Sequence, residues 1–160
     1  MAAAEKRDAE TELVTLRNTN IKVCDGCFGC EKTGVCHIKD DMQEIYGKIL
    51  SADAVVLGSP TYFDAPTSLA MGFIHRIAYP LYGKIKGKRF ASVVVGQTPG
   101  AEGVASRGKV EGYFKLVAST FELDYTGSLS VTARDPNDAS KITDIEKQCE
   151  NVATKILKPS

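Results

Sequence analysis

The sequence predicts an α/β fold with three layers and a mainly parallel sheet, and three observations indicate this class. Two apolar runs, 54–58 and 90–96, have the composition of strands that are buried on both faces. Each run is followed by a segment containing proline or glycine and then by a stretch with helical periodicity, which is the order of a βαβ unit. A third run near 123–131 continues the alternation, so residues 1–160 are expected to form a single domain.

The N-terminal part is predicted to deliver the chain to a cysteine-rich loop at 24–36. Residues 13–17 are expected to form a short strand, and Ile21 and Val23 lead into the loop. Asp40 and Asp41 then suit a helix N-terminus, where carboxylates interact favourably with the helix dipole, so no catalytic role is assigned to them. The helix that follows is amphipathic, with apolar residues at helical spacing: Met42, Ile45, Tyr46, Ile49 and Leu50.

The remaining elements alternate between strands and helices. The strand at 54–58 leads through the loop SPTYFDAPTS to a helix whose predicted apolar face carries Leu69, Phe73, Ile74 and Ile77. The strand at 90–96 is followed by a predicted loop over 97–108 and a helix over 108–119. A last helix, from about 138 to 157, places Cys149 on an apolar stripe, so this cysteine is predicted to be a core residue rather than a redox thiol.

Composition and charge exclude several classes of partner. The chain carries 20 basic and 20 acidic side chains, so no net field favours nucleic acid or an anionic membrane. The first residues, MAAAEKRDAETE, are polar and do not resemble a signal peptide, and no membrane span follows. A cytoplasmic protein is therefore expected. In a reducing compartment, clustered cysteines indicate metal or redox chemistry rather than structural disulfides.

Four cysteines form the strongest functional motif. Cys24, Cys27, Cys30 and Cys36 follow the spacing C-x2-C-x2-C-x5-C, and interspersed glycines permit the tight turns that such a loop needs. Three close cysteines with a fourth nearby are more typical of a cubane iron-sulfur centre than of zinc, which usually joins two C-x2-C pairs across a longer gap. A zinc site, in which His37 could replace one thiolate, and an unmetallated or redox thiol cluster remain the alternatives.

Two further segments are predicted to form a ligand site. In an open parallel sheet, ligands bind beyond the carboxyl ends of the strands, and 59–67 and 96–108 both follow strands there. The first segment offers hydroxyl groups and two aromatic rings, and the second offers an amide side chain and glycines. This combination suits a flat aromatic cofactor with polar edges.

At these residues the chain resembles a known family. The runs CDGCFGCEKTGVCHIKDDM and VVLGSPTYFDAPTSLAMGFIHR, within a match over 11 to about 120, resemble the iron-sulfur flavoproteins of the flavodoxin-like NAD(P)H-dependent FMN reductase superfamily. The resemblance implies that Cys24, Cys27, Cys30 and Cys36 bind a [4Fe-4S] cluster. It also implies that FMN lies along two segments whose residues are Ser59, Pro60, Thr61, Tyr62 and Phe63 in the first, and Gly96, Gln97 and Thr98 in the second.

The resemblance also implies a difference. Family members begin with an apolar strand and a turn that wraps the FMN phosphate, and neither is present in this sequence. A flavodoxin-like sheet that lacks this first strand is therefore expected, with two open strand edges. A second difference is His75 before Arg76, where the family commonly has aspartate; we interpret His75 as a residue of the helix surface.

The predicted function is that of an electron-transfer oxidoreductase that couples a [4Fe-4S] cluster to FMN. The resemblance implies reduced ferredoxin or NAD(P)H as the electron donor and assembly into a homo-oligomer. The alternative is a non-enzymatic metal-binding or assembly module that keeps the cysteine loop but does not bind flavin.

Overall fold

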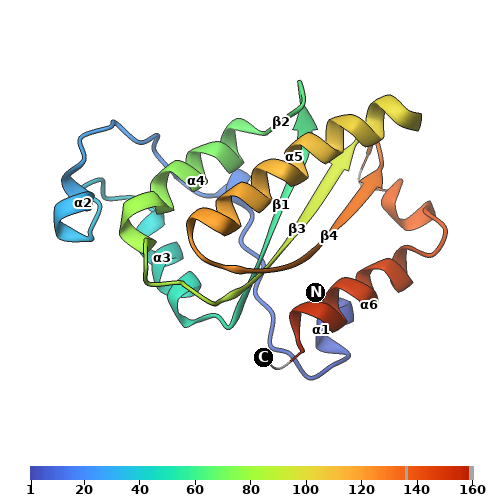
Figure 1. Cartoon of the computed structure of the whole chain (residues 1–160), viewed down its shortest axis with the longest axis horizontal. Coiled ribbons are helices and arrows are strands. Elements are labelled where there is room, and N and C mark those ends of the chain that lie inside the picture. Colours follow the sequence, from blue (N-terminus) through green and yellow to red (C-terminus); the bar gives the residue numbers. More distant parts are fainter. Residues whose placement is uncertain (136, 159–160) are drawn as a thin grey trace.

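The computed structural model describes residues 1–135 and 137–158, and its centre is a small twisted sheet (Figure 1). The strand order is β2-β1-β3-β4, and the three long strands run parallel. The short β2 pairs antiparallel with the end of β1. The bounds are Ala54–Tyr62 for β1, Ala65–Pro66 for β2, Arg89–Gly96 for β3 and Asp124–Thr132 for β4. The predicted parallel α/β sheet is confirmed, and positions 136, 159 and 160 of the predicted domain lie outside the described residues.

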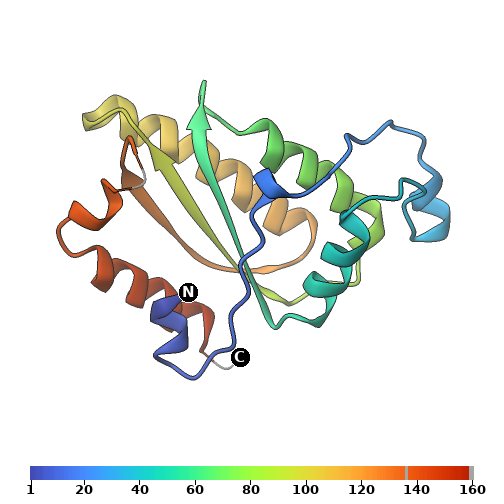
Figure 2. The same ribbon diagram turned by 180° about the vertical axis from the view of Figure 1, so that it is seen from behind.

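Helices cover both faces of the sheet, which gives the predicted three layers. Ser130 of β4 accepts a hydrogen bond from Arg107 of α5, whereas Gly127 of the same strand lies beneath Lys155 of α6. Successive residues of a strand point to opposite faces, and Ser130 and Gly127 are three positions apart, so they lie on opposite faces of β4. The helices α5 and α6 therefore cover opposite sides of the sheet (Figures 1 and 2). The helices of the first layer are α3 (Met42–Ser51), α4 (Ser68–Leu81) and α5 (Gly100–Thr120); those of the second are α6 (Ile145–Ile156) and the short α1 (Ala2–Glu5).

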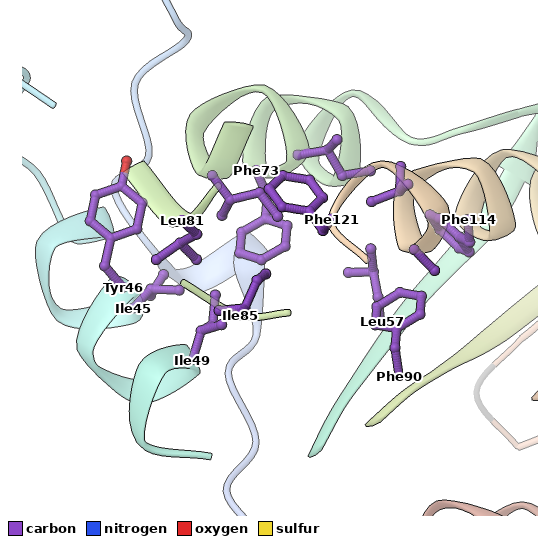
Figure 3. Packing of buried hydrophobic residues seen from close by; sticks show 14 of the residues in the cluster. Ile45, Tyr46, Ile49, Leu57, Phe73, Leu81, Ile85, Phe90, Phe114 and Phe121 are labelled. Atoms are coloured by element: carbon purple, nitrogen blue, oxygen red, sulfur yellow. The ribbon is translucent and has the colours of Figure 1, made fainter. Parts of the chain in front are cut away.

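The main hydrophobic cluster lies on the side of α3, α4 and α5 (Figure 3). It forms because the apolar stripes of these helices converge on β1 and β3, as the helical spacing of the sequence predicts. Phe114 of α5 and Met42 of α3 are completely buried within it. The predicted stripe of α4 is confirmed at Phe73, Ile74 and Ile77, but Leu69 in the first turn is 48% exposed.

The N-terminal segment does not form the predicted strand. Residues 13–15 have no regular structure, and Leu16–Asn18 form a 3-10 helix, η1. A strand needs a neighbouring strand for its amides, but the amides of Asn20 and Lys22 are bonded to the carboxylates of Asp41 and Asp40 instead. This part of the chain is therefore held to the fold by side chains rather than by the sheet.

Other boundaries also differ from the prediction. β1 continues through the expected loop to Tyr62, and α5 begins at Gly100 instead of 108, so much of the second predicted loop is helical. The last helix begins at Ile145, after a short 3-10 turn, η2 (Ala139–Lys141). Cys149 is only partly buried and lies outside the main cluster, because Ala153 and Ile156 are the residues that α6 buries.

Of the two open strand edges that the sequence predicts, only the far edge of β1 is present in the described sheet, because residues 13–17 form no strand. Within the described residues, only Thr61 and Tyr62 pair with another strand there, and that strand is the two-residue β2. On the face opposite the main cluster, Val56 remains 51% exposed. No helix in the described parts of the chain is long and apolar enough to span a membrane.

The close packing of α5 against the end of β3 leads to a prediction. A Cβ added to Gly103 would lie 1.7 Å from the carbonyl oxygen of Thr98, whereas a Cβ at Gly108 of the same helix would meet nothing within 4 Å. Gly103→Ala should therefore destabilise the fold by about 1–3 kcal/mol, as overpacking does. Gly108→Ala should stabilise it by about 0.5–1 kcal/mol, because alanine favours the helix. Urea denaturation checks both, and a stabilised Gly103→Ala protein would contradict the packing described.

Candidate functional site

The cysteine loop folds back on itself through three left-handed residues. Gly26 and Gly34 have φ values of 71° and 68°, which glycine adopts without strain. Phe28 has a φ of 56° and starts the one-turn helix α2 (Gly29–Thr33), which Gly34 ends. The edge of the Phe28 ring packs against Tyr79 of α4 at a centroid distance of 6.2 Å. The loop therefore has a defined shape that glycine and one aromatic contact maintain.

All four cysteines of the motif are free thiols that differ in exposure. Cys24 and Cys27 are exposed, Cys30 is intermediate and Cys36 is buried. Burial raises the pKa of Cys30, and the proximity of Cys36, Cys24 and Cys27 raises it further. The four predicted ligands thus share one loop, but among the described residues no three of their sulfurs lie within 4.8 Å of one another.

A second group of polar side chains joins the two ends of the loop. Asp25 accepts a hydrogen bond from the amide of Cys27 at 3.2 Å, and its other oxygen lies 2.8 Å from Nε2 of His37. Hydrogen bonds from Cys27 and from His37 lower the pKa of Asp25. Ligand atoms of Asp25, Cys27 and His37 lie within 4.8 Å of one another, so a donor set for a single metal ion also exists at the exposed face of this loop.

A buried ion pair fixes the stems of the cysteine loop to α4. Both side chains of Arg76 and Asp40 are fully buried, and the guanidinium donates to the carboxylate at 2.6 and 2.9 Å. The same guanidinium donates to the carbonyl oxygens of Lys22, before the loop, and Ile38, after it. One side chain of α4 therefore holds both ends of the segment that carries the four cysteines.

The surroundings of this pair determine its charge state. Burial raises the pKa of Asp40, but hydrogen bonds from Arg76 and from the amides of Lys22 and Met42 outweigh it, so the net shift is downward. Burial raises the pKa of Tyr46 to about 12, and its hydroxyl donates to the carbonyl of Arg76 at 2.7 Å. Asp40 does bond the first turn of α3, as predicted, but most of its contacts serve the loop.

The cysteine loop lies away from the carboxyl edge of the sheet. It contacts the C-terminal end of α4, through Tyr79, and the turn that follows, where Lys84 donates to the carbonyl of Gly34 at 3.1 Å. α4 begins next to the carboxyl end of β1 and runs 14 residues, about 21 Å, towards the other end of the sheet. The two predicted sites therefore lie at opposite ends of α4 (Figure 1).

The first predicted flavin segment is the end of β1 together with its turn. The hydroxyl of Ser59 is buried and accepts a hydrogen bond from the amide of Thr67 at 3.0 Å, so it fixes the start of α4 rather than facing solvent. Thr61 is partly buried, and Pro60 is exposed. Tyr62 is 63% exposed and Phe63 projects fully into solvent from a left-handed turn. The two rings are available to a ligand, whereas the hydroxyl of Ser59 is already engaged.

The second predicted flavin segment lies directly beside the first. Gly96 ends β3, and a Cβ added there would lie 3.2 Å from Oγ1 of Thr61 and 3.1 Å from Cγ of Arg107. Gln97 and Thr98 are exposed on the turn before α5. Across the same edge, Lys109 of α5 pairs with Asp64 of the β1–β2 turn at 2.5 Å. The structure thus brings together the two strand ends that the sequence predicted to meet.

Two arginines of these sites were not found from the sequence. Arg76 stands in the apolar pattern of α4, between Ile74 and Ile77, and a charge at such a position indicates a buried partner. The sequence predicts a loop at Arg107, but this residue lies inside α5 and is 6% exposed. Only the tertiary contacts of these residues show what they bind.

Comparison with known proteins agrees with this architecture. The sequence profile described as NADPH-dependent FMN reductase matches residues 1–110. The chain belongs to this family. An iron-sulfur flavoprotein of Archaeoglobus fulgidus is 37% identical over 92 residues, which are 56% of this chain and 45% of the relative. A second iron-sulfur flavoprotein of that organism is 34% identical over 114 residues, which are 71% of this chain and 50% of the relative.

Solved structures support the fold of this family member. RosB, crystallised with 8-demethyl-8-formylriboflavin-5'-phosphate, superposes with a TM-score of 0.71 over 97% of this chain and 66% of RosB, at 16% identity. At such low identity the likeness concerns the fold. The chain spans about half the length of the iron-sulfur flavoproteins that it matches.

The buried ion pair generates a prediction about stability. Asp40→Asn should lower the free energy of unfolding by about 3–5 kcal/mol, because it leaves Arg76 buried without its counter-ion. Because the folded pKa of Asp40 is depressed, its contribution is present above the unfolded pKa of about 3.9 and is lost as the pH falls through the folded pKa. Denaturation measured from pH 7 to pH 3 should show the free energy of unfolding of the wild type falling with the pH, and a smaller fall in the Asp40→Asn variant.

A matched control is Asp41→Asn. This neighbouring aspartate is exposed, and among the described residues its side chain accepts a hydrogen bond only from the amide of Asn20, so the substitution should cost less than about 1 kcal/mol. Equal losses in the two variants would show that the pair with Arg76 does not determine the stability of this region.

Proposed function

We propose that this protein is an electron-transfer flavoprotein in which the cysteine loop binds a [4Fe-4S] cluster and the carboxyl edge of the sheet binds FMN. The observation that carries the proposal is the gathering of four free thiols in one loop whose two stems are both held by Arg76. Membership of the NADPH-dependent FMN reductase family and similarity to iron-sulfur flavoproteins support the pairing of the two cofactors.

The donor set of the loop fits the cluster. Cys24, Cys27, Cys30 and Cys36 supply four soft thiolate ligands, which iron-sulfur centres require. A four-iron cluster binds each thiolate on a different iron, so the sulfurs need not surround one point. A single zinc ion would need its four ligand atoms around one point. The group of side chains whose ligand atoms lie within 4.8 Å of one another contains only one of these cysteines, Cys27, together with Asp25 and His37.

The edge formed by β1 and β3 fits a flat ring. The absence of a side chain at Gly96 lets Thr61 and Arg107 pack closely on the end of β3, since a Cβ there would approach them to 3.2 and 3.1 Å. Tyr62 and Phe63 offer aromatic surface, while Gln97 and Thr98 offer polar groups on the facing turn. In this proposal Ser59 and Pro60 shape the end of β1. A bound flavin would supply the ability to accept a hydride and to pass on single electrons.

The separation of the two sites bears on assembly. Within one chain, the cysteine loop and the strand ends lie at opposite ends of α4. Direct electron transfer is therefore favoured if a second copy of the chain places its FMN site next to the cysteine loop of the first. An apolar groove between α4 and α5 begins next to the cysteine loop, with Tyr79, Tyr82 and Leu116 exposed in it by 40–61%. We propose a homo-oligomer that uses this groove, which sedimentation velocity at low micromolar concentration would test. A monomer would contradict it.

The proposal includes NAD(P)H or reduced ferredoxin as the electron donor and a cytoplasmic location. The family profile supports the nicotinamide donor, since its description names NADPH. The alternative, a metal-binding module without flavin, is favoured by one observation: in the described chain no strand lies beside Ala54–Pro60 on the far edge of β1. Flavin absorbance of the purified protein distinguishes the two functions.

The cluster is tested by replacing a ligand. Cys27→Ala should remove one thiolate and make the cluster labile, so iron and sulfide per chain should fall by at least half after anaerobic purification. Cys149→Ala is the matched control, because this cysteine lies on α6, on the other side of the sheet from the cluster loop, and its metal content should be unchanged. Stoichiometric zinc without sulfide in the wild type would overturn the cluster assignment.

The flavin site is tested at Tyr62. Tyr62→Ala should weaken FMN binding about fivefold or more, since an aromatic contact contributes about 1 kcal/mol. Leu50→Ala is the control, because Leu50 is also exposed, at 43%, but lies near the C-terminal end of α3, before the start of β1. Flavin fluorescence titration measures both affinities, and unchanged binding in a folded Tyr62→Ala protein would place the flavin elsewhere.

A further inference from the structure

Arg107 is a buried cation without a counter-ion. It is 6% exposed, and within the described residues no carboxylate lies within 4.0 Å of its guanidinium, in contrast to Arg76. Its Nε donates to Oγ of Ser130 at 3.1 Å, and one Nη donates to the carbonyl of Thr98 at 3.2 Å. Neutral acceptors do not offset the cost of removing a charge from water, which amounts to several kcal/mol for an ion. A ligand with negative charge would offset this cost.

The position of Arg107 indicates where such a ligand would lie. Its stem packs on Gly96 at the end of β3, where an added Cβ would also lie 3.2 Å from Oγ1 of Thr61. Its guanidinium reaches Ser130 of β4 and the turn at Thr98. The charge therefore sits at the carboxyl edge of the three parallel strands, directly beside both proposed flavin segments.

The guanidinium is only partly used by the protein. Nε and one Nη group have acceptors, but in the described chain the second Nη group donates to no side chain or carbonyl. Among the described residues, Nε of Arg76 is the only fully buried polar side-chain atom without a hydrogen-bond partner. The second Nη of Arg107 also lacks a partner but does not belong to this class, so it is accessible from outside the protein. It remains available to a ligand that arrives at this edge.

We propose that Arg107 is a flavin-binding residue whose free Nη group donates to the polar edge of the ring and whose charge favours the reduced form. This inference rests on the proposed binding of FMN. A hydride from a reduced nicotinamide carries two electrons and a proton, so its transfer leaves oxidised nicotinamide and adds one negative charge to the ring. A fixed cation next to the ring must then bind reduced FMN more tightly than oxidised FMN.

The test compares both redox states in three variants. Arg107→Gln removes the charge, Arg107→Lys keeps it, and Arg89→Gln removes a charge from a partly buried arginine at the opposite end of β3, where it donates to the carbonyl of Lys158. FMN affinity is measured by fluorescence for the oxidised state, and the midpoint potential is measured by dithionite titration against a reference dye. Circular dichroism verifies folding.

Arg107→Gln should weaken the binding of reduced FMN at least tenfold more than that of oxidised FMN, which lowers the two-electron midpoint potential by about 30 mV or more. Arg107→Lys and Arg89→Gln should stay within threefold of the wild type in this ratio. If the glutamine variant does not fold, Arg107→Met, which keeps the aliphatic stem on Gly96, provides the same comparison.

Riboflavin, which lacks the phosphate, distinguishes the ring from the phosphate as the group that Arg107 contacts. The same dependence on redox state with riboflavin supports the proposal. Equal weakening of both states, or an effect seen only with FMN, would show that Arg107 supports the Thr98 turn or binds the phosphate, and would overturn it. A wild type that binds no flavin would instead overturn the proposed function, and this inference with it.

Discussion

The buried pair of Arg76 and Asp40 is the interaction on which the cysteine loop depends. The loop contains no long helix or strand, so its position cannot come from a hydrogen-bonded ladder. Arg76 replaces such a ladder by bonding the carbonyls of Lys22 and Ile38 and the carboxylate of Asp40, while Asp40 bonds the amide of Lys22. An irregular segment with exposed thiols is thereby attached to a helix that the hydrophobic cluster holds in place.

This attachment also explains a cost that the protein tolerates. Two fully buried charges lose their hydration, and Nε of Arg76 has no partner among the described residues. An apolar pair of equal volume could stabilise α4 as well, but it could not bond the backbone on both sides of the loop. The ion pair is therefore better understood as a device that fixes the loop than as a source of stability.

The two arginines lie in different surroundings, which fit different purposes. Arg76 is neutralised by Asp40 and serves the architecture of the loop. Arg107 is also buried but keeps an accessible Nη group, and it is bonded only to a hydroxyl and a carbonyl within the described chain, so its charge remains uncompensated at the carboxyl edge of the sheet. Together with the exposed rings of Tyr62 and Phe63, this charge makes the strand ends a polarised edge that suits an electron-rich ring.

The sequence by itself determined the class of fold, the four thiols and the meeting of the two strand ends. These follow from local patterns: apolar runs identify β1 and β3, helical spacing identifies α3 and α4, and the spacing of Cys24 to Cys36 confines four sulfurs to one loop whatever surrounds it.

Only the tertiary structure decided the rest, because it depends on partners distant in the chain. Residues 13–17 have strand-like composition, but no strand of the described chain pairs with them, and the amides of Asn20 and Lys22 bond to Asp41 and Asp40 instead. The placement of the cysteine loop follows from contacts with Tyr79 and Lys84, more than 45 residues away. The burial of Arg107 follows from the start of α5 at Gly100 and its packing across Gly96 against Ser130. A local sequence pattern does not specify such contacts, because they form only when the layers of the fold pack against one another.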